Sequence, residues 1–218
     1  MMDDAGAIDG LGAIVLTGGR SSRMGRPKET LAFEGEPLLA RVVGRVAAVA
    51  RPVVVVAAPG QALPTLPPWA RIARDAVEGG GPVEGLAAGF AAFGPEIQAV
   101  FVTTTDAPFV HAALVRRLVA LRSTADGPPW DAVVPVVAGR AQPLCAIYAT
   151  RVHAEVRAML RDGQRRAGLL ADRVRTLFAD EAVLLADPAL RAADGELLSL
   201  RGVNTPAEYE AALARGGA

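Results

Sequence analysis

Cysteine and histidine are almost absent from this chain of 218 residues, which has one cysteine and two histidines. Cys145 has no second cysteine for an internal disulfide, and the three side chains together are unlike the ligand sets of zinc clusters. A chain without disulfides fits a reducing cytoplasm. Because Cys145 lies in the apolar run PLCAIY, we expect a buried structural side chain there and not a nucleophile.

An excess of charge of either sign is also missing. Lys plus Arg and Asp plus Glu both number 23, so the chain lacks the overall positive charge typical of proteins that bind nucleic acids or anionic membranes. No run of about 18 apolar residues occurs, and the acidic start MMDDAGAIDG has neither the basic nor the apolar part of a signal peptide. We therefore expect a cytoplasmic protein with no nucleic-acid partner and no membrane association.

Aromatic residues make up only 5% of the chain, although 51% of its residues are hydrophobic. The core must therefore consist of small and β-branched side chains distributed over many elements. The apolar runs 13–16 and 53–58 both end at loops rich in glycine or proline, which is typical of buried parallel strands. Residues 37–49 place apolar side chains at helical spacing between these runs, which predicts a βαβ unit.

Further elements continue this alternation of strand and helix: a weak strand around Ile72, a helix at 83–93, a strand at 99–104 and a helix at 112–121. The runs 132–137 and 143–148, separated by a short turn, predict an antiparallel excursion. Helices at 151–160 and 164–174, a strand around 198–203 and a helix from Pro206 follow. We expect one domain over residues 1–218, with 1–11 as a flexible N-terminal segment. The expected fold is α/β, with three layers (α/β/α) around a mostly parallel sheet.

The segment LTGGRSSRMGRPK, residues 16–28, directly follows the first strand. Its glycines allow backbone N–H groups to approach phosphate oxygens, its serines can donate hydrogen bonds, and Arg23 and Lys28 can neutralise phosphate charge. The spacing matches neither the Walker A pattern nor the Gly-x-Gly-x-x-Gly pattern of dinucleotide folds. The segment indicates a site for a nucleoside triphosphate, while a solvated glycine-rich turn is the alternative on glycine content alone.

Taken as a whole, this segment resembles the L-x-G-G-x-S-x-R-M-G-x-x-K signature of the nucleotidyltransferase family that contains molybdenum-cofactor guanylyltransferase. The resemblance continues in order through Asp75 and the segments GGGPVEGLAAGF, TTTDAPFV, RAQPLCAIY and VNTPAEY. It implies a Rossmann-like nucleotidyltransferase fold. It also implies transfer of GMP from GTP to the terminal phosphate of molybdopterin, with or without molybdenum, and release of pyrophosphate.

The resemblance also implies roles for individual residues. The residues implied in nucleotide binding are Leu16, Thr17, Gly18, Gly19, Lys28, Asp75 and Asp106. Arg23, Lys28 and Asp106 are implied in catalysis, with Mg2+ carried by Asp106. Arg165, Arg166 and Asn204 are implied in binding the acceptor.

Each of these assignments has a plainer structural alternative. Asp106 follows the strand 99–104 and should emerge at the carboxyl end of a parallel strand, where ligands bind in open α/β sheets. In isolation a helix N-cap or turn residue is the favoured interpretation, and the resemblance to the family reverses that preference. Asp75 could be a solvated loop acid, and the pair Arg165 and Arg166 could be the start of a surface helix.

Two positions depart from the family pattern, and they concern selection of the base. Val56 stands where the family has Asn, and Gly202 replaces the first Asn of the closing Asn-x-Asn-Thr-Pro. The alternatives are a molybdenum-cofactor cytidylyltransferase that uses CTP and a sugar-phosphate nucleotidyltransferase. A third is a non-catalytic module that binds nucleotide or pterin and delivers the pterin to acceptor enzymes. For the transferase itself, we expect transient docking with molybdenum-insertion proteins or acceptor molybdoenzymes. The pair Gly18 and Gly19 favours guanine, and Lys28 together with Asp106 favours an enzyme.

Overall fold

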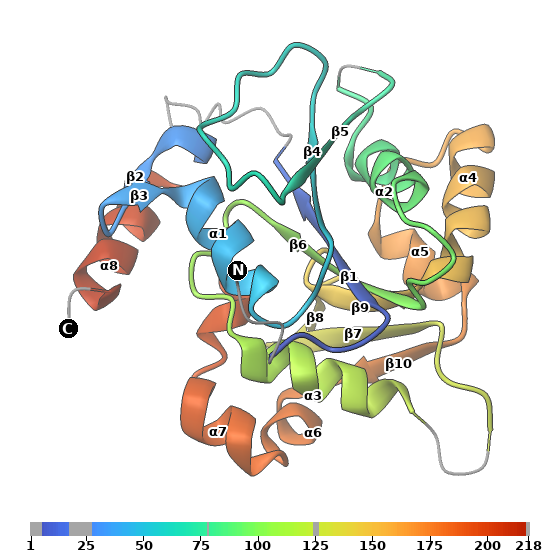
Figure 1. The fold of residues 1–218 in the computed structure, drawn as a ribbon. Coiled ribbons are helices and arrows are strands. Elements are labelled where there is room, and N and C mark those ends of the chain that lie inside the picture. Colours follow the sequence, from blue (N-terminus) through green and yellow to red (C-terminus); the bar gives the residue numbers. More distant parts are fainter. Residues whose placement is uncertain (1–5, 18–27, 78, 124–126, 217–218) are drawn as a thin grey trace.

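A mixed sheet forms the centre of the computed structural model, which describes residues 6–17, 28–77, 79–123 and 127–216. Its strand order is β10-β7-β9-β6-β1-β4-β5, with β8 paired to β7 (Figure 1). The strands are β1 (Leu11–Leu16), β4 (Val53–Ala57), β5 (Arg71–Arg74), β6 (Ala99–Thr104), β7 (Ala132–Val137), β8 (Arg140–Ala141), β9 (Ala146–Ala149) and β10 (Thr176–Ala179).

Most neighbouring strands of this sheet run parallel. β1 is parallel to both β4 and β6, β5 is parallel to β4, and β10 is parallel to β7. β9 lies between β6 and β7 and is antiparallel to both. The expected mostly parallel sheet with an antiparallel excursion is therefore confirmed. One consequence is that β1, β4, β5 and β6 all present their carboxyl ends at the same edge.

Helices cover both faces of the sheet and complete the three layers (Figure 1). One face packs against α1 (Leu38–Ala47), α3 (Ala112–Arg122), α6 (Glu181–Leu185) and α7 (Pro188–Asp194). The other packs against α2 (Pro82–Ala91), α4 (His153–Arg161) and α5 (Gly168–Arg173). In β1, Ala13 and Val15 face the first core, whereas Ile14 and Leu16 face the second. Burial on both faces explains why these strands are continuously apolar.

None of the helices in the described part of the chain combines the length and the apolar composition that crossing a membrane requires.

A small hairpin and the C-terminal helix form a separate cluster beside the sheet: β2 (Ala32–Phe33), β3 (Glu36–Pro37) and α8 (Pro206–Gly216). The buried ring of Phe33 meets Phe109 and Tyr209 edge to face, with centroids 5.7 Å and 6.3 Å away. The buried Arg41 lies over the Phe33 ring and donates from Nε to the Pro108 carbonyl at 3.2 Å. This cluster ties α8 to the loop that follows β6.

The predicted strand at 198–203 is wrong. Residues Leu198–Leu200 form a 3-10 helix, η3, and residues 201–204 are irregular. The carboxylate of Asp194 accepts hydrogen bonds from the N–H groups of Leu198 at 2.6 Å and Ser199 at 3.0 Å. A side chain therefore satisfies the backbone donors that a strand would direct to its neighbour.

Other boundaries also differ from the predicted ones. The expected helix 164–174 begins only at Gly168, and the strand expected at 143–148 begins at Ala146, because a turn bonds the Cys145 N–H to the Gln142 carbonyl at 3.0 Å. The first strand starts at Leu11, and the Ile8 N–H bonds to the Val49 carbonyl at 2.9 Å.

Candidate active site

Three segments that are far apart in the sequence meet at the carboxyl edge of the sheet. Lys28 lies in the 3-10 turn η1 (Lys28–Thr30), Asp106 follows β6, and Asn204 precedes α8. The Lys28 ammonium donates to Asn204 Oδ1 at 2.9 Å and lies 3.7 Å from Asp106 Oδ2. The side chains of Lys28 and Asp106 are 19% and 24% exposed, so both groups remain accessible to a ligand.

Asp106 is held through its carboxylate by the preceding strand and through its main-chain carbonyl by the segment before α8. Thr104 donates its hydroxyl to Asp106 Oδ1, and the Val203 N–H donates to the Asp106 carbonyl at 2.7 Å. A Cβ on Gly202 would lie 3.4 Å from Asp106 Oδ2 and 3.0 Å from Asn204 Nδ2. The absence of a side chain at Gly202 therefore lets this segment pass close to both polar groups.

The end of β1 contributes Leu16 and Thr17. The Thr17 N–H bonds to the Val56 carbonyl at 2.9 Å, and the Leu16 carbonyl accepts from the Thr105 N–H at 3.0 Å. The Thr17 hydroxyl oxygen is buried and has no hydrogen-bond partner among the described residues. The predicted site residues Gly18, Gly19 and Arg23 lie outside the described part of the chain.

A cavity of about 390 Å³ opens beside this cluster, and Leu16, Val56, Asp75, Gly81, Gly85 and Thr104 are among the residues that line it. Asp75 follows β5, and its Oδ1 is buried without a hydrogen-bond partner among the described residues. The oxygen faces Gly85 of α2, which has no side chain to fill the space between them; a Cβ on Gly85 would lie 3.4 Å from Asp75 Oδ1. Burial, followed by the charge of Glu84, raises the pKa of the Asp75 carboxyl. An unpaired carboxylate oxygen in such a cavity can accept hydrogen bonds from a ligand.

The three residues predicted to bind the acceptor are divided between two places. Arg165 and Arg166 are exposed in the irregular segment before α5. Arg165 lies next to Gly81, where an added Cβ would be 3.7 Å from Arg165 Cβ, and its guanidinium donates to the Leu160 carbonyl at 3.2 Å. Asn204 instead contacts Lys28. Arg165 thus borders the glycine segment of the cavity and Arg166 follows it in the chain, while Asn204 belongs to the Lys28 and Asp106 cluster.

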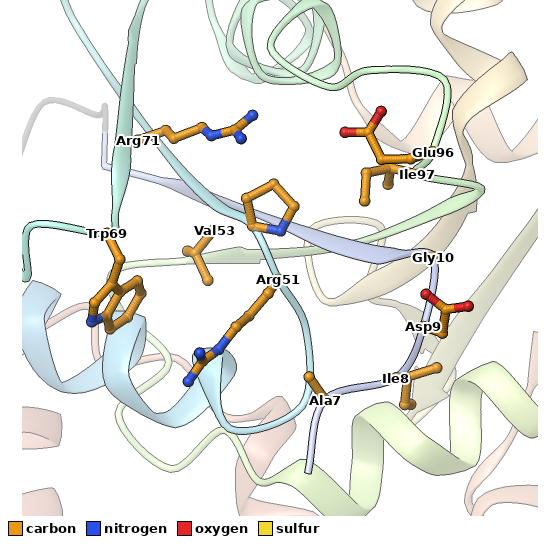
Figure 2. Close-up of a pocket in the computed structure, with 11 residues that line it drawn as sticks. Ala7, Ile8, Asp9, Gly10, Arg51, Val53, Trp69, Arg71, Glu96 and Ile97 are labelled. Carbon is orange, nitrogen blue, oxygen red and sulfur yellow. The ribbon is translucent and has the colours of Figure 1, made fainter. Parts of the chain in front are cut away.

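A second pocket, of about 630 Å³, lies at the opposite edge of the sheet, where β1, β4 and β5 begin. Figure 2 shows Arg51 and Arg71 on one side of it and Asp9 and Glu96 on the other. The two guanidinium groups donate to main-chain carbonyls, Arg51 to Ala47 at 3.1 Å and Arg71 to Ala92 at 3.4 Å. This pocket lies away from Asp106, and its cations are engaged by the fold itself.

The sequence interpretation did not single out Thr104 or Gln61. Thr104 belongs to the TTTDAPFV segment, and its position two residues before Asp106 is the signal that was available. Gln61 lies in a proline-rich connection, and no pattern in the sequence marks it. It bonds the Thr17 carbonyl at 3.1 Å and Glu29 Oε1 at 2.8 Å.

Comparison with known proteins finds similar sequences and similar folds. A protein named probable molybdenum cofactor guanylyltransferase from Mycobacterium bovis (strain BCG / Pasteur 1173P2) is 34% identical over 183 residues, covering 80% of this chain and 87% of that protein. The crystal structure of molybdopterin-guanine dinucleotide biosynthesis protein A from Archaeoglobus fulgidus has the same fold, with a TM-score of 0.73, 23% identity and coverage of 94% and 98% of the two chains.

The fold is shared with nucleotidyltransferases that act on other substrates. The 2-C-methyl-D-erythritol 4-phosphate cytidylyltransferase from Thermus thermophilus aligns with a TM-score of 0.66 at 19% identity, covering 94% of this chain and 98% of that one. The chain is thus a Rossmann-like α/β nucleotidyltransferase in fold. Residues 13–179, which include most of β1 and Asp106, match the model of the MobA-like NTP transferase domain. The chain therefore belongs to the MobA-like NTP transferase domain family.

Proposed function

We propose that this protein transfers GMP from GTP to the terminal phosphate of molybdopterin or Mo-molybdopterin, forming molybdopterin guanine dinucleotide. The observation that carries the proposal is the cluster of Lys28, Asp106 and Asn204 at the carboxyl edge of the sheet. The cavity beside it contains an Asp75 oxygen that has no hydrogen-bond partner in the part of the chain that the structure describes. The relative named as a probable molybdenum cofactor guanylyltransferase supports the same reaction. We place the reaction in the cytoplasm.

The chemistry requires two polyanions to meet. An oxygen of the acceptor phosphate attacks the α-phosphorus of GTP, a new P–O bond forms, and the bond to the bridging oxygen breaks, so that pyrophosphate leaves with the electron pair. The nucleophile is already anionic, so no general base is needed. The task of the protein is positioning and charge neutralisation. Lys28 would offset charge on the phosphates, and Arg23 is proposed to assist it.

The donor set around Asp106 fits Mg2+. This ion typically takes one or two carboxylates and completes its shell with water and substrate phosphate oxygens, so a single carboxylate beside a triphosphate site is sufficient. The described residues contain no group of three or more acidic, His or Cys side chains that would hold a metal without substrate. When bound, Mg2+ neutralises charge on the phosphates. Thr104 orients the Asp106 carboxylate through Oδ1.

The cavity beside Asp75 supports guanine as the base. The Watson–Crick edge of guanine carries two adjacent donors, N1–H and the N2 amino group, and one carboxylate can accept from both. Cytosine presents only one amino donor on the same edge. Val56 lines the same cavity and supplies no polar side-chain group, which leaves Asp75 as the proposed reader of the base. The remaining nucleotide-binding residues of this proposal are Leu16, Thr17, Gly18 and Gly19.

The acceptor is assigned to Arg165, Arg166 and Asn204. Guanidinium groups suit a terminal phosphate; both arginines are exposed, and Arg165 lies next to Gly81. Asn204 lies apart from the two arginines and accepts a hydrogen bond from Lys28. Transient docking with molybdenum-insertion proteins or acceptor molybdoenzymes would follow product formation.

The decisive experiment supplies each of the four nucleoside triphosphates together with Mg2+ and molybdopterin, and identifies the product by mass. Of the four triphosphates, we expect only GTP to give pyrophosphate and a dinucleotide product, molybdopterin guanine dinucleotide. Exclusive use of CTP would establish the cytidylyltransferase alternative, which the fold shared with a cytidylyltransferase keeps open. Binding of nucleotide without any pyrophosphate release would instead indicate a delivery module.

A further inference from the structure

Gln61 connects the two ends of the glycine-rich segment. It lies in the long connection between β4 and β5 (Figure 1). Its Nε2 donates to the Thr17 carbonyl at 3.1 Å and to Glu29 Oε1 at 2.8 Å, while its Oε1 accepts from the Ala58 N–H at 2.9 Å. Both N–H donors of the amide and its carbonyl are therefore engaged. Thr17 precedes the segment 18–27, and Glu29 directly follows Lys28.

The turn that carries Gln61 is itself held in place. Arg74, the last residue of β5, donates from Nη1 to the carbonyls of Ala58 at 2.9 Å and Gln61 at 2.7 Å. The chain continues from Arg74 directly into Asp75. Arg74 of the sheet thus holds the Gln61 backbone in place. The Gln61 side chain in turn holds the Thr17 carbonyl and, through Glu29, the turn that contains Lys28.

We propose that Gln61 is a positioning residue that sets the distance between Thr17 and Lys28, and thereby shapes the triphosphate site. The inference rests on the proposed nucleotide-binding function. Glu29 is only 8% exposed, and Gln61 Nε2 donates to its carboxylate, so loss of the amide would leave a largely buried charge without this donor. The Thr17 carbonyl would lose the same donor. A displacement of about 1 Å in such a site can cost on the order of 100-fold in activity.

The amide group is required because a carboxylate at position 61 could not donate to either acceptor. Gln61→Glu would also place a second negative charge against Glu29. The double variant Gln61→Glu with Glu29→Gln reverses the direction of that one hydrogen bond and restores it, while the Thr17 carbonyl still lacks its donor. Comparing Gln61→Glu with the double variant therefore measures the contact with residue 29, next to Lys28. Comparing the double variant with the unaltered protein measures the contact with the Thr17 carbonyl.

The test measures the Kd of GTP with Mg2+ by calorimetry in the absence of acceptor, where no transfer occurs, and then the KM for GTP in the full reaction. For Gln61→Ala we expect both constants to rise by about tenfold or more. The matched control is Gln98→Ala, which removes an exposed amide directly before β6, at the opposite edge of the sheet. We expect the control to bind GTP as the unaltered protein does.

Two readouts exclude a merely structural role. Partial unfolding of Gln61→Ala would lower kcat and leave KM unchanged, and that result would overturn the proposal, as would a Kd equal to that of Gln98→Ala. We expect the double variant to bind GTP more tightly than Gln61→Glu alone and less tightly than the unaltered protein; equal binding by the two variants would also overturn it. If the unaltered protein binds a different triphosphate, the proposed function fails, and the same comparison is made with that nucleotide.

Discussion

Lys28 is the only lysine in a chain whose other basic residues are all arginine. An ammonium is a compact point charge, whereas a guanidinium is a planar fork, so the two are not equivalent beside a crowded phosphate. In the structure this ammonium lies between Asn204 and Asp106. A compact ammonium at this position can follow the phosphate oxygens as their charge changes during the reaction. As the only lysine, Lys28 is also the only side-chain amine in the chain.

Replacing Lys28 should affect turnover far more than folding. Its contact with Asp106 is partly solvated, and such pairs contribute about 0–1 kcal/mol to stability. Loss of a charge that acts on the leaving phosphates costs on the order of 100-fold or more in kcat. We expect Lys28→Ala to show that loss with a nearly unchanged Tm, and Asp106→Ala to lose metal-dependent activity. Normal turnover by either variant would contradict the assigned roles.

An amine-directed reagent gives an independent check on Lys28. Lys28 carries the only side-chain amine, so acylation followed by peptide mass analysis should modify this side chain and otherwise only the N-terminal amine. GTP with Mg2+ should protect Lys28 from the reagent. Equal labelling with and without nucleotide would place the triphosphate elsewhere.

Asp75 illustrates a conflict between stability and binding at a single residue. Burial and then the charge of Glu84 raise the pKa of its carboxyl, so the folded state disfavours the ionised form relative to the unfolded chain. The free energy of unfolding therefore falls as the pH rises from the ordinary aspartate pKa through the raised one, and the loss persists at neutral pH.

Asp75→Asn should therefore raise the Tm at neutral pH while weakening GTP binding. The gain in Tm should shrink as the pH falls below the ordinary aspartate pKa, because Asp75 is then protonated in both states of the unaltered protein. Thermal denaturation across pH, with GTP affinity measured in parallel, tests both parts. A lower Tm at neutral pH combined with unchanged GTP affinity would contradict the prediction.

At the scale of elements, two helical glycines provide a matched comparison. Gly44 lies within α1, and a Cβ added there would have no neighbouring atom within 4 Å, whereas a Cβ on Gly89 of α2 would approach Ile14 Cδ1 at 2.7 Å and Cγ1 at 2.8 Å. Gly89 therefore allows α2 to pack closely on β1, which brings the helix next to the cavity containing Asp75.

Gly44→Ala should stabilise the protein by up to about 1 kcal/mol through helix propensity. Gly89→Ala should destabilise it by about 1–3 kcal/mol, because overpacking against Ile14 exceeds the same gain. Urea denaturation with comparison of midpoints measures both changes. Stabilisation of similar size in both variants would show that α2 can shift away from β1 without cost.

The elements also differ in how far local sequence predicts them. The strands β1 and β4 follow from continuous apolar runs, because they are buried on both faces, and the helix α1 follows from apolar residues at helical spacing. The segment at 198–200 has the composition of a strand, but the carboxylate of Asp194 binds its N–H groups and turns it into η3. Such a side-chain cap depends on one contact and leaves no periodic signal.

At the scale of the whole molecule, nucleotide binding should be linked to folding. A ligand that binds only the folded state at 100 times its Kd adds about 2.7 kcal/mol to the unfolding free energy, which is a rise of several degrees in Tm for a protein of this size. We expect this rise with GTP and Mg2+, a smaller one with CTP and Mg2+, and little with GTP after chelation of the metal. Thermal denaturation at equal nucleotide concentration tests the order, and equal shifts with all nucleotides would contradict base selection by Asp75.

What the sequence by itself determined is local: the βαβ unit, the glycine-rich composition of residues 16–28, and the emergence of Asp106 at the end of a strand. These follow because periodicity and glycine chemistry act within one or two elements. Only the tertiary structure brought Lys28 within 2.9 Å of Asn204, 176 residues away, separated Arg165 from that cluster, and placed the Gln61 amide between Thr17 and Glu29. Those contacts depend on strand order and on the packing of irregular segments, where residue spacing along the chain carries no information about distance.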